Sequence, residues 1–168
     1  MKKVFAAILV SGLAISGFST GSVDAASGNS IQSVKSLQQG DTTLEGAKIG
    51  ASIQSVLNEN NAPIYSYSPD GNEHYYEFKK ENGVLVVTAD GKKNKGKIIR
   101  VSMSYNDTNG PTYKDVKSQV SKNAVTREHY NNVTGNFGYV QDDELSYQFS
   151  SASPSDKDIK LYRIDMGK

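Results

Sequence analysis

Apolar residues follow two different spacings along this chain, and the two spacings predict two kinds of secondary structure. Ile31, Val34 and Leu37 lie three residues apart, which predicts a short helix that ends near Gly40. From about residue 64 onward, apolar and polar residues alternate, and this period of two is typical of a strand with one buried face. Because short helical stretches are followed by runs of several strand-like stretches, we predict an α+β fold with antiparallel sheets.

A first unit of this kind spans residues 44–108. Its predicted helix follows Ser52, whose hydroxyl can accept a hydrogen bond from a free amide of the first helical turn. Pro63 ends the helical region, since proline cannot continue a helix. The strands predicted after it cover residues 64–67, 74–78, 84–88 and 98–105. In the last of these strands, alternation places four residues on one face: Ile99, Val101, Met103 and Tyr105.

A second unit, residues 109–168, repeats the order of the first. Thr112 precedes its predicted helix, and Asp115 adds part of a capping box. The apolar positions of that helix are Tyr113, Val116 and Val120. The strand-like stretches after it contain Phe137 and Tyr139, then Leu145, Tyr147 and Phe149, then Leu161, Ile164 and Met166. We therefore predict two similar, duplicated units, each a short helix or helix pair packed on an antiparallel sheet of three to four strands.

The first 25 residues have the three-part pattern of a secretory signal peptide. A start with two lysines precedes an apolar run over residues 4–18. The small residues Val23 and Ala25 then suit signal peptidase, which predicts cleavage after Ala25 or, alternatively, after Ala26. The apolar run is shorter than the roughly 20 residues that span a bilayer. We therefore predict a protein secreted to the cell exterior, without a membrane anchor.

Composition narrows the chemistry that the mature protein can perform. The chain contains no cysteine, which excludes disulfides, thiol nucleophiles and a lipid-modified cysteine. It has 19 lysines and arginines against 18 aspartates and glutamates, and cleavage after Ala25 leaves a formal net charge of zero. A neutral domain has no overall electrostatic drive toward nucleic acid or anionic membranes. After cleavage, residues 26–43 would form a linker and the short N-terminal helix.

Several features of the first unit resemble a known architecture. They are the run Ile49-Gly50-Ala51-Ser52, the helical Val56, and the step Ala62-Pro63 before a tyrosine-rich hairpin. This order is similar to the tandem-repeat fold of the β-lactamase-inhibitor-protein family and of related outer-membrane-assembly lipoproteins. In size, export signal and layout, the chain also resembles small secreted staphylococcal-type proteins, the type of immunodominant staphylococcal antigen B. These resemblances imply binding, inhibition or surface association rather than catalysis.

Neither histidine lies in a catalytic or metal-binding motif. His74 and His129 each lie beside a glutamate, but the sequence has no His-x-x-x-His, and its one Gly-x-Ser-x-Gly match, residues 17–21, falls within the predicted signal peptide. We expect both histidines to be exposed or structural, and we predict no catalytic residue, no metal site and no cofactor. The acidic residues at 142–144, 156 and 158 lack the spacing of a calcium loop, so we expect solvated loops there.

The densest charge in the chain is a run of lysines in a predicted loop. Four lysines occupy six positions: Lys92, Lys93, Lys95 and Lys97. They could contact an anionic polymer, such as nucleic acid or teichoic acid, through their flexible ammonium groups. The alternative is a hairpin loop kept soluble by its charge, and the neutral balance of the domain favours that interpretation.

Tyrosines supply the second set of candidate binding residues. The chain has 10 tyrosines and no tryptophan, and four cluster around the first hairpin: Tyr65, Tyr67, Tyr75 and Tyr76. Tyrosine is favoured at interface hot spots because it offers contact area at a low entropic cost. Alternation places Tyr75 and Tyr76 on opposite faces, so we expect one in the core and one exposed. Tyr130 and Tyr147 are comparable candidates, and filling the edge of the sheet core is the alternative role.

The sequence therefore predicts a secreted, non-enzymatic binding protein. The expected partner is an unidentified extracellular protein, recognised through the sheet face or the hairpin loops. Inhibition of a secreted or host enzyme is the most concrete form of this hypothesis. Association with an anionic polymer through residues 92–97 is an alternative of a different class, and an uncharacterised hydrolase is a third.

Overall fold

Each helix that the structure describes begins at a hydroxyl side chain. The computed structural model describes residues 28–167, so the predicted signal peptide lies outside the described residues. The helices are α1 (Ile31–Gln38), α2 (Ile53–Glu59) and α3 (Tyr113–Lys117). The N-caps predicted at Ser52 and Thr112 are confirmed, and Asp115 completes the capping box by accepting a bond from the Thr112 amide. No helix within residues 28–167 has the length and apolar character needed to cross a membrane.

The strands form one large antiparallel sheet and one small hairpin. The hairpin pairs β1 (Thr43–Leu44) with β2 (Ala47–Lys48). The strands of the large sheet are β3 (Ile64–Tyr67), β4 (Glu73–Lys80), β5 (Gly83–Asp90), β6 (Ile98–Tyr105), β7 (Val125–His129), β8 (Phe137–Asp142), β9 (Leu145–Ser150) and β10 (Lys160–Gly167). Its spatial order is β3-β4-β5-β6-β10-β9-β8-β7, with antiparallel pairing throughout. The predicted α+β class is therefore confirmed.

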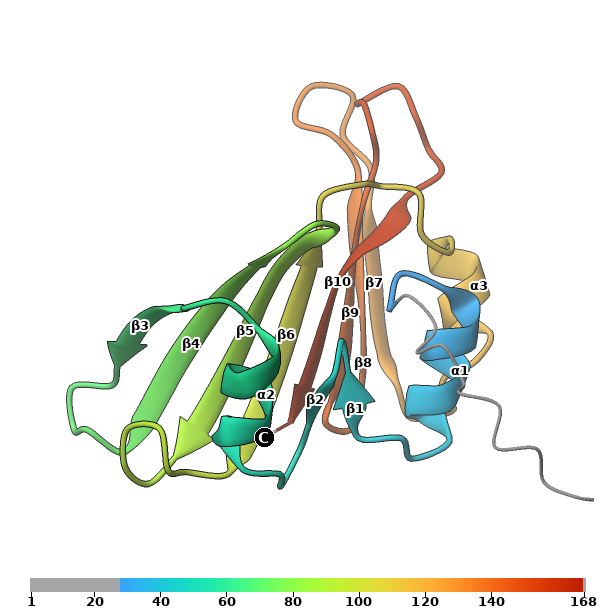
Figure 1. Ribbon diagram of the computed structural model, residues 1–168. Helices are drawn as coiled ribbons and strands as arrows, with labels where there is room; N and C mark the ends of the chain where they lie inside the picture. Colours follow the sequence, from blue (N-terminus) through green and yellow to red (C-terminus); the bar gives the residue numbers. More distant parts are fainter. Residues whose placement is uncertain (1–27, 168) are drawn as a thin grey trace, which may run out of the picture.

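One face of the large sheet carries the hydrophobic core. A row of buried side chains crosses six strands in register: Phe78, Leu85, Met103, Ile164, Tyr147 and Val140. The helices pack their apolar sides on the same face, with Val34 from α1, Ile53 from α2 and Val116 from α3 in the same buried cluster. Figure 1 shows α2 in front of β4–β6, and α1 and α3 together beside β7–β9. The helices are too short to be stable alone, so this packing holds them in place.

The strand at one edge, β7, was not predicted from the sequence. Its residues Val125, Arg127, Glu128 and His129 are exposed, and β7 has a neighbouring strand on only one side. A strand without a buried face shows no alternation of polar and apolar residues, so the sequence pattern does not predict β7. With β7 included, each half of the large sheet is formed by four consecutive strands, and a helix precedes each set of four along the chain.

The prediction that Ile99 shares a face with Val101 is wrong. The pairing of β5 with β6 shifts between Thr88 and Ala89, so that Ile98 rather than Ile99 pairs with Ala89. Such a bulge reverses the side-chain alternation on one side of it. Ile98 is consequently buried and Ile99 only half-buried, whereas Val101 lies in the core as predicted.

Two further predictions in the second half need correction. Val120 is not helical, because α3 ends at Lys117, although Val120 still packs against the core. Asp142 is not in a solvated loop but is buried at the end of β8. Its carboxylate accepts hydrogen bonds from the Ser121 amide (2.7 Å) and the Ser121 hydroxyl (2.6 Å), which ties the segment after α3 to the sheet. Its neighbour Asp143 is exposed, as expected.

The buried hydroxyl of Tyr147 makes the fold sensitive to alkali. Burial raises the pKa of Tyr147 from 10.0 to about 12. An unfolded tyrosine ionises near pH 10, so the stability that depends on the neutral hydroxyl is present below that pH and is lost as the pH rises toward 12. We expect the urea midpoint to fall over this interval, and to fall less in Tyr147→Phe. An equal alkaline loss in wild type and Tyr147→Phe would contradict this assignment.

Candidate binding surfaces

The second face of the large sheet is left uncovered by the described helices. Pairing in register places the side chains that alternate with the core residues on this face, and they are half-buried or exposed apart from Thr88. We call it the open face. Short polar residues occupy its middle: Ser102 and Ser104 on β6, and Ser146 and Gln148 on β9. Arg163 and Asp165 of β10 lie between these two strands, and aromatic and further charged side chains lie on the outer strands.

All three arginines of the chain lie on the open face. Arg100 is on β6, Arg163 on β10 and Arg127 on β7. The chain has 16 lysines, so arginine is by far the rarer basic residue, and composition alone does not explain why all three arginines lie on one face. Arginine is enriched at protein–protein interfaces and lysine is depleted there, because the planar guanidinium makes directed hydrogen bonds and stacks on aromatic rings.

Neighbouring polar groups fix two of these arginines. Arg100 Nη2 lies 2.7 Å from Glu73 Oε1, and the Tyr75 hydroxyl donates to the other oxygen of Glu73 at 2.8 Å. Arg163 binds Asp165 through two nitrogens, with Nη2 at 2.7 Å from Oδ1 and Nε at 3.0 Å from Oδ2. Ordered side chains lose little entropy when a partner binds. Arg100 Nε is buried and has no hydrogen-bond partner within the described residues.

A pocket lies at the β7–β8 side of this face. Its volume is about 320 Å³, and its lining residues are Arg127, Glu128, His129, Phe137, Gly138 and Tyr139. Four of them, namely Arg127, His129, Phe137 and Tyr139, point toward the open face. Phe137 is 54 % exposed, and its ring centroid is 4.9 Å from that of His129. The pocket is large enough for one bulky side chain of a partner and offers it both aromatic surface and a guanidinium group.

Some of the predicted tyrosine and lysine candidates, namely Tyr65, Tyr67, Tyr76 and Lys93, lie together on the opposite face. The Lys93 ammonium lies 4.1 Å from the centre of the Tyr65 ring, and the rings of Tyr65 and Tyr67 stack with centroids 6.1 Å apart. Tyr76 lies in the core, and its hydroxyl accepts a hydrogen bond from the Asn94 amide at 2.7 Å. Tyr75 lies on the open face, so the expected placement of Tyr75 and Tyr76 on opposite faces is confirmed, although Tyr75 is half-buried rather than exposed.

The four lysines project from a well-anchored loop. Lys92, Lys93, Lys95 and Lys97 are all exposed, and none forms an ion pair within residues 28–167. The Lys97 amide donates to the Asp90 carboxylate at 2.7 Å, and Gln54 of α2 donates to the Asn94 carbonyl at 2.7 Å. Four exposed lysine side chains therefore extend from an anchored loop beside the half-buried Tyr65 ring and the exposed Tyr67 ring.

Both histidines make contacts that suit a structural role. His74 is buried, and its Nε2 lies 2.9 Å from the Gly91 carbonyl oxygen, which can only accept a hydrogen bond. Its Nδ1 lies within hydrogen-bond distance of the Tyr65 hydroxyl, at 2.8 Å. His129 is exposed beside Phe137. In the part of the chain that the structure describes, no group of three or more His, Asp or Glu side chains is placed to hold a metal ion.

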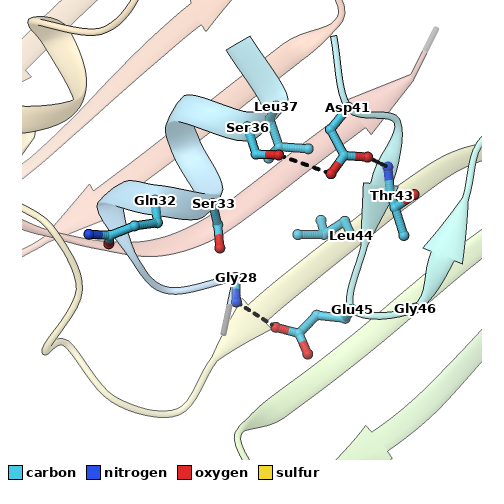
Figure 2. A pocket seen from close by; sticks show the side chains of 10 residues that line it. All are labelled: Gly28, Gln32, Ser33, Ser36, Leu37, Asp41, Thr43, Leu44, Glu45 and Gly46. Carbon is cyan, nitrogen blue, oxygen red and sulfur yellow. Dashed lines mark hydrogen bonds between the residues drawn. The ribbon is translucent and has the colours of Figure 1, made fainter. Parts of the chain in front are cut away.

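A further pocket, between α1 and the β1–β2 hairpin, has a volume of about 260 Å³ (Figure 2). Glu45, at positive φ, closes one end, and its carboxylate accepts hydrogen bonds from the Gly28 amide (3.0 Å) and the Tyr105 hydroxyl (3.2 Å). Burial and the nearby carboxylate raise the pKa of Tyr105 above its ordinary range. The acidic groups here are used in joining the N-terminal segment to the fold, and the volume is smaller than that of usual ligand sites.

The sequence pattern does not indicate the arginines or the pocket on the open face as binding residues. Phe137 and Tyr139 have the spacing of ordinary strand residues, and Arg127 lies on the unpredicted strand β7. One signal was present in the sequence: Arg100 and Arg163 occupy matching positions in the two closing strands. In a chain with only three arginines, such a match indicates a shared face.

Comparison with known proteins places the chain in one family. The family described as SA0570-like matches residues 1–167, so the chain belongs to the SA0570-like family, which is of staphylococcal type. No curated protein matches the chain, and no solved structure matches it. The resemblance to the tandem-repeat inhibitor fold and to the named staphylococcal antigen therefore receives no support from these comparisons.

Proposed function

We propose that this member of the SA0570-like family is a secreted, non-enzymatic protein that binds another protein outside the cell through the open face of its sheet. The observation that carries the proposal is the composition of that face. All three arginines lie there, together with exposed aromatic residues and a pocket between β7 and β8. The N-terminal pattern of residues 1–25 is the basis for placing the partner outside the cell.

The physical character of the open face suits recognition of a folded protein. Arginine and aromatic side chains are enriched at protein–protein interfaces, and ordering such side chains on binding costs conformational entropy. Here Glu73 and Asp165 already hold Arg100 and Arg163 in place, which lowers that cost. The small serines in the middle let a partner approach the backbone of β6 and β9. Inhibition of a secreted or host enzyme is the most concrete form of this function.

We also propose that the two halves of the sheet arose by duplication, as the tandem-repeat resemblance implies. The strand order supports this idea, since β3-β4-β5-β6 meets β10-β9-β8-β7 with the closing strands β6 and β10 side by side. Arg100 and Arg163 occupy matching positions on these two strands. A duplicated unit of this kind presents two related halves of one binding face.

A second candidate function is association with an anionic polymer. It is favoured by the contact between Lys93 and Tyr65 and by the stacking of Tyr65 on Tyr67. Lysines bind phosphates, while exposed aromatic rings stack on bases or sugars. This surface is on the opposite side of the sheet from the arginines, so separate variants can test the two functions.

A capture experiment with two matched variants tests both proposals. The mature chain, residues 26–168, is immobilised and exposed to host serum and to bacterial surface extract at low and high salt. We expect wild type to retain a protein at both salt concentrations. Replacing Arg127 and Tyr139 by serine should reduce its retention at least tenfold, since hot-spot truncations cost about 2 kcal/mol or more. Replacing Lys92, Lys93 and Lys95 by alanine should leave retention unchanged.

The opposite pattern would support the polymer alternative. In that case retention would collapse at high salt, the lysine variant would lose it, and single-stranded DNA or teichoic acid would compete. Retention that neither variant changes would contradict both proposals. Unchanged unfolding midpoints would show that the variants remain folded.

A further inference from the structure

The two edges of the large sheet differ in how they are protected. At one edge, β7 carries Arg127 and Glu128 in its middle, and charges on an edge strand discourage pairing with another strand. At the other edge, β3 consists of Ile64, Tyr65, Ser66 and Tyr67 and carries no charge. Figure 1 shows β3 at the far end of the sheet, with no helix beyond it. The β3 edge is therefore open to pairing.

The backbone groups that β3 presents outward belong to its two tyrosines. Hydrogen-bonded and non-hydrogen-bonded pairs alternate along an antiparallel ladder. The Ser68 amide donates to the Glu73 carbonyl at 2.9 Å, so Ser66, two residues earlier, also directs its amide toward β4. The amide and carbonyl groups of Tyr65 and Tyr67 consequently point away from the sheet. They can receive one further strand.

The sequence around β3 is nearly palindromic. Residues 63–69 read Pro-Ile-Tyr-Ser-Tyr-Ser-Pro, with Ser66 at the centre. Tyr65 and Tyr67 lie one residue to either side of Ser66, and the two prolines lie three residues to either side. A two-fold axis through Ser66 would thus pair each tyrosine with the other tyrosine of a second copy. The same axis would place each proline opposite a proline.

We propose that this chain forms a homodimer by antiparallel pairing of β3 with β3 of a second copy, centred on Ser66. In this register Tyr65 of each copy exchanges backbone hydrogen bonds with Tyr67 of the other. The stacked pair Tyr65–Tyr67 continues into the equivalent pair of the second copy, and the exposed Tyr67 (63 %) becomes covered. The open faces of the two copies join into one longer face. This inference concerns an edge of the sheet and does not depend on the proposed function.

The same features limit the assembly to two copies. Pro63 and Pro69 lack amide protons, so the ladder between the copies ends symmetrically after the tyrosines. Pairing of β3 with β7 would place Arg127 and Glu128 against an uncharged strand and leave their charges partly desolvated. A contact that uses the same surface on both copies closes on itself, whereas a β3–β7 contact would extend without limit. With a four-residue strand, the dimer should be weak and should depend on concentration.

A charge-pairing experiment tests the dimer. Ser66 is exposed, and in the dimer its side chain faces the Ser66 side chain of the second copy at a distance of about 5 Å. Ser66→Asp and Ser66→Lys should each raise the dissociation constant about tenfold, because like charges then face one another. An equimolar mixture of the two variants should dimerise at least as well as wild type. Sedimentation velocity over a concentration series measures all four samples.

Two further measurements make the result specific to this edge. Val125→Lys places a charge on the opposite edge strand and should leave dimerisation unchanged. The amides of Tyr65 and Tyr67 should exchange slowly with solvent at dimer-forming concentrations and rapidly on dilution. A wild-type protein that stays monomeric at about 1 mM, where even a weak contact is populated, would overturn the proposal. So would a mixture of the two charged variants that fails to associate, or dimerisation that both variants retain.

Discussion

Replacing Ile164 by alanine will lower the free energy of unfolding by about 2–5 kcal/mol and will loosen both halves of the sheet. Ile164 is fully buried on β10, and it lies between Met103 of β6 and Tyr147 of β9. Its truncation removes apolar contacts from both neighbours and leaves a cavity that close-packed strands cannot fill. Hydrogen exchange should show faster opening in both halves, in β4–β5 as well as in β8–β9.

The matched control is the same substitution at Ile64. This residue is 71 % exposed on β3, so Ile64→Ala should change stability by less than about 0.5 kcal/mol in the monomer. If Ile164→Ala weakened β8–β9 and left β4–β5 fully protected, the two halves would be separate folding units, contrary to the single core that joins them.

A second large effect is expected at Gly96. A Cβ at this position would overlap the backbone oxygen of Asp90, which cannot move without breaking the bond from the Asp90 amide to the Lys97 carbonyl. Gly96 also accepts a hydrogen bond from the Ile53 amide at the start of α2. Gly96→Ala should therefore cost about 1–3 kcal/mol and release the lysine-rich loop from the sheet. Urea unfolding measures the cost, and loss of the Lys93–Tyr65 contact in NMR spectra reports the loop.

Gly91→Ala, in the same loop, distinguishes the stability cost of steric overlap from the cost of backbone strain. Gly91 has a φ of +76°, but a Cβ there would meet its nearest neighbour only at 3.6 Å. The cost should be the ordinary one of about 1 kcal/mol for a left-handed residue, with the loop still in place. Equal losses of stability in the two variants would show that overlap with Asp90 adds nothing to the cost of Gly96→Ala.

Local signals in the sequence predicted the elements well wherever one residue acts on its near neighbours. Ser52 and Thr112 begin helices because their hydroxyls reach amides only two or three residues away. The bulge that buries Ile98 instead of Ile99 depends on how β5 aligns with β6, which no local pattern encodes. Strand β7 lacks a buried side, so its residues carry no period to detect.

The candidate surface was harder to predict, because a face is assembled from strands distant in sequence. Tyr65 and Lys93 were each identified as candidates, but their contact arises only when the loop after β5 returns over β3. Arg127 and Arg163 share the open face through the pairing of three successive strands, β10, β9 and β8, with β7. Register across a sheet, rather than residue type, decides which side chains lie together.

The central position of β10 has a consequence for the order in which the protein can fold. Strand β10 is the last strand along the chain, yet it lies between β6 and β9 in the middle of the sheet. In a chain that crosses a membrane with its N-terminus first, β3 to β6 would cross before β10. The edge of β6 that pairs with β10 would then stay unpaired until residues 160–167 had crossed. The core could then form only after nearly the whole chain had crossed, so the chain would remain unfolded while it crosses.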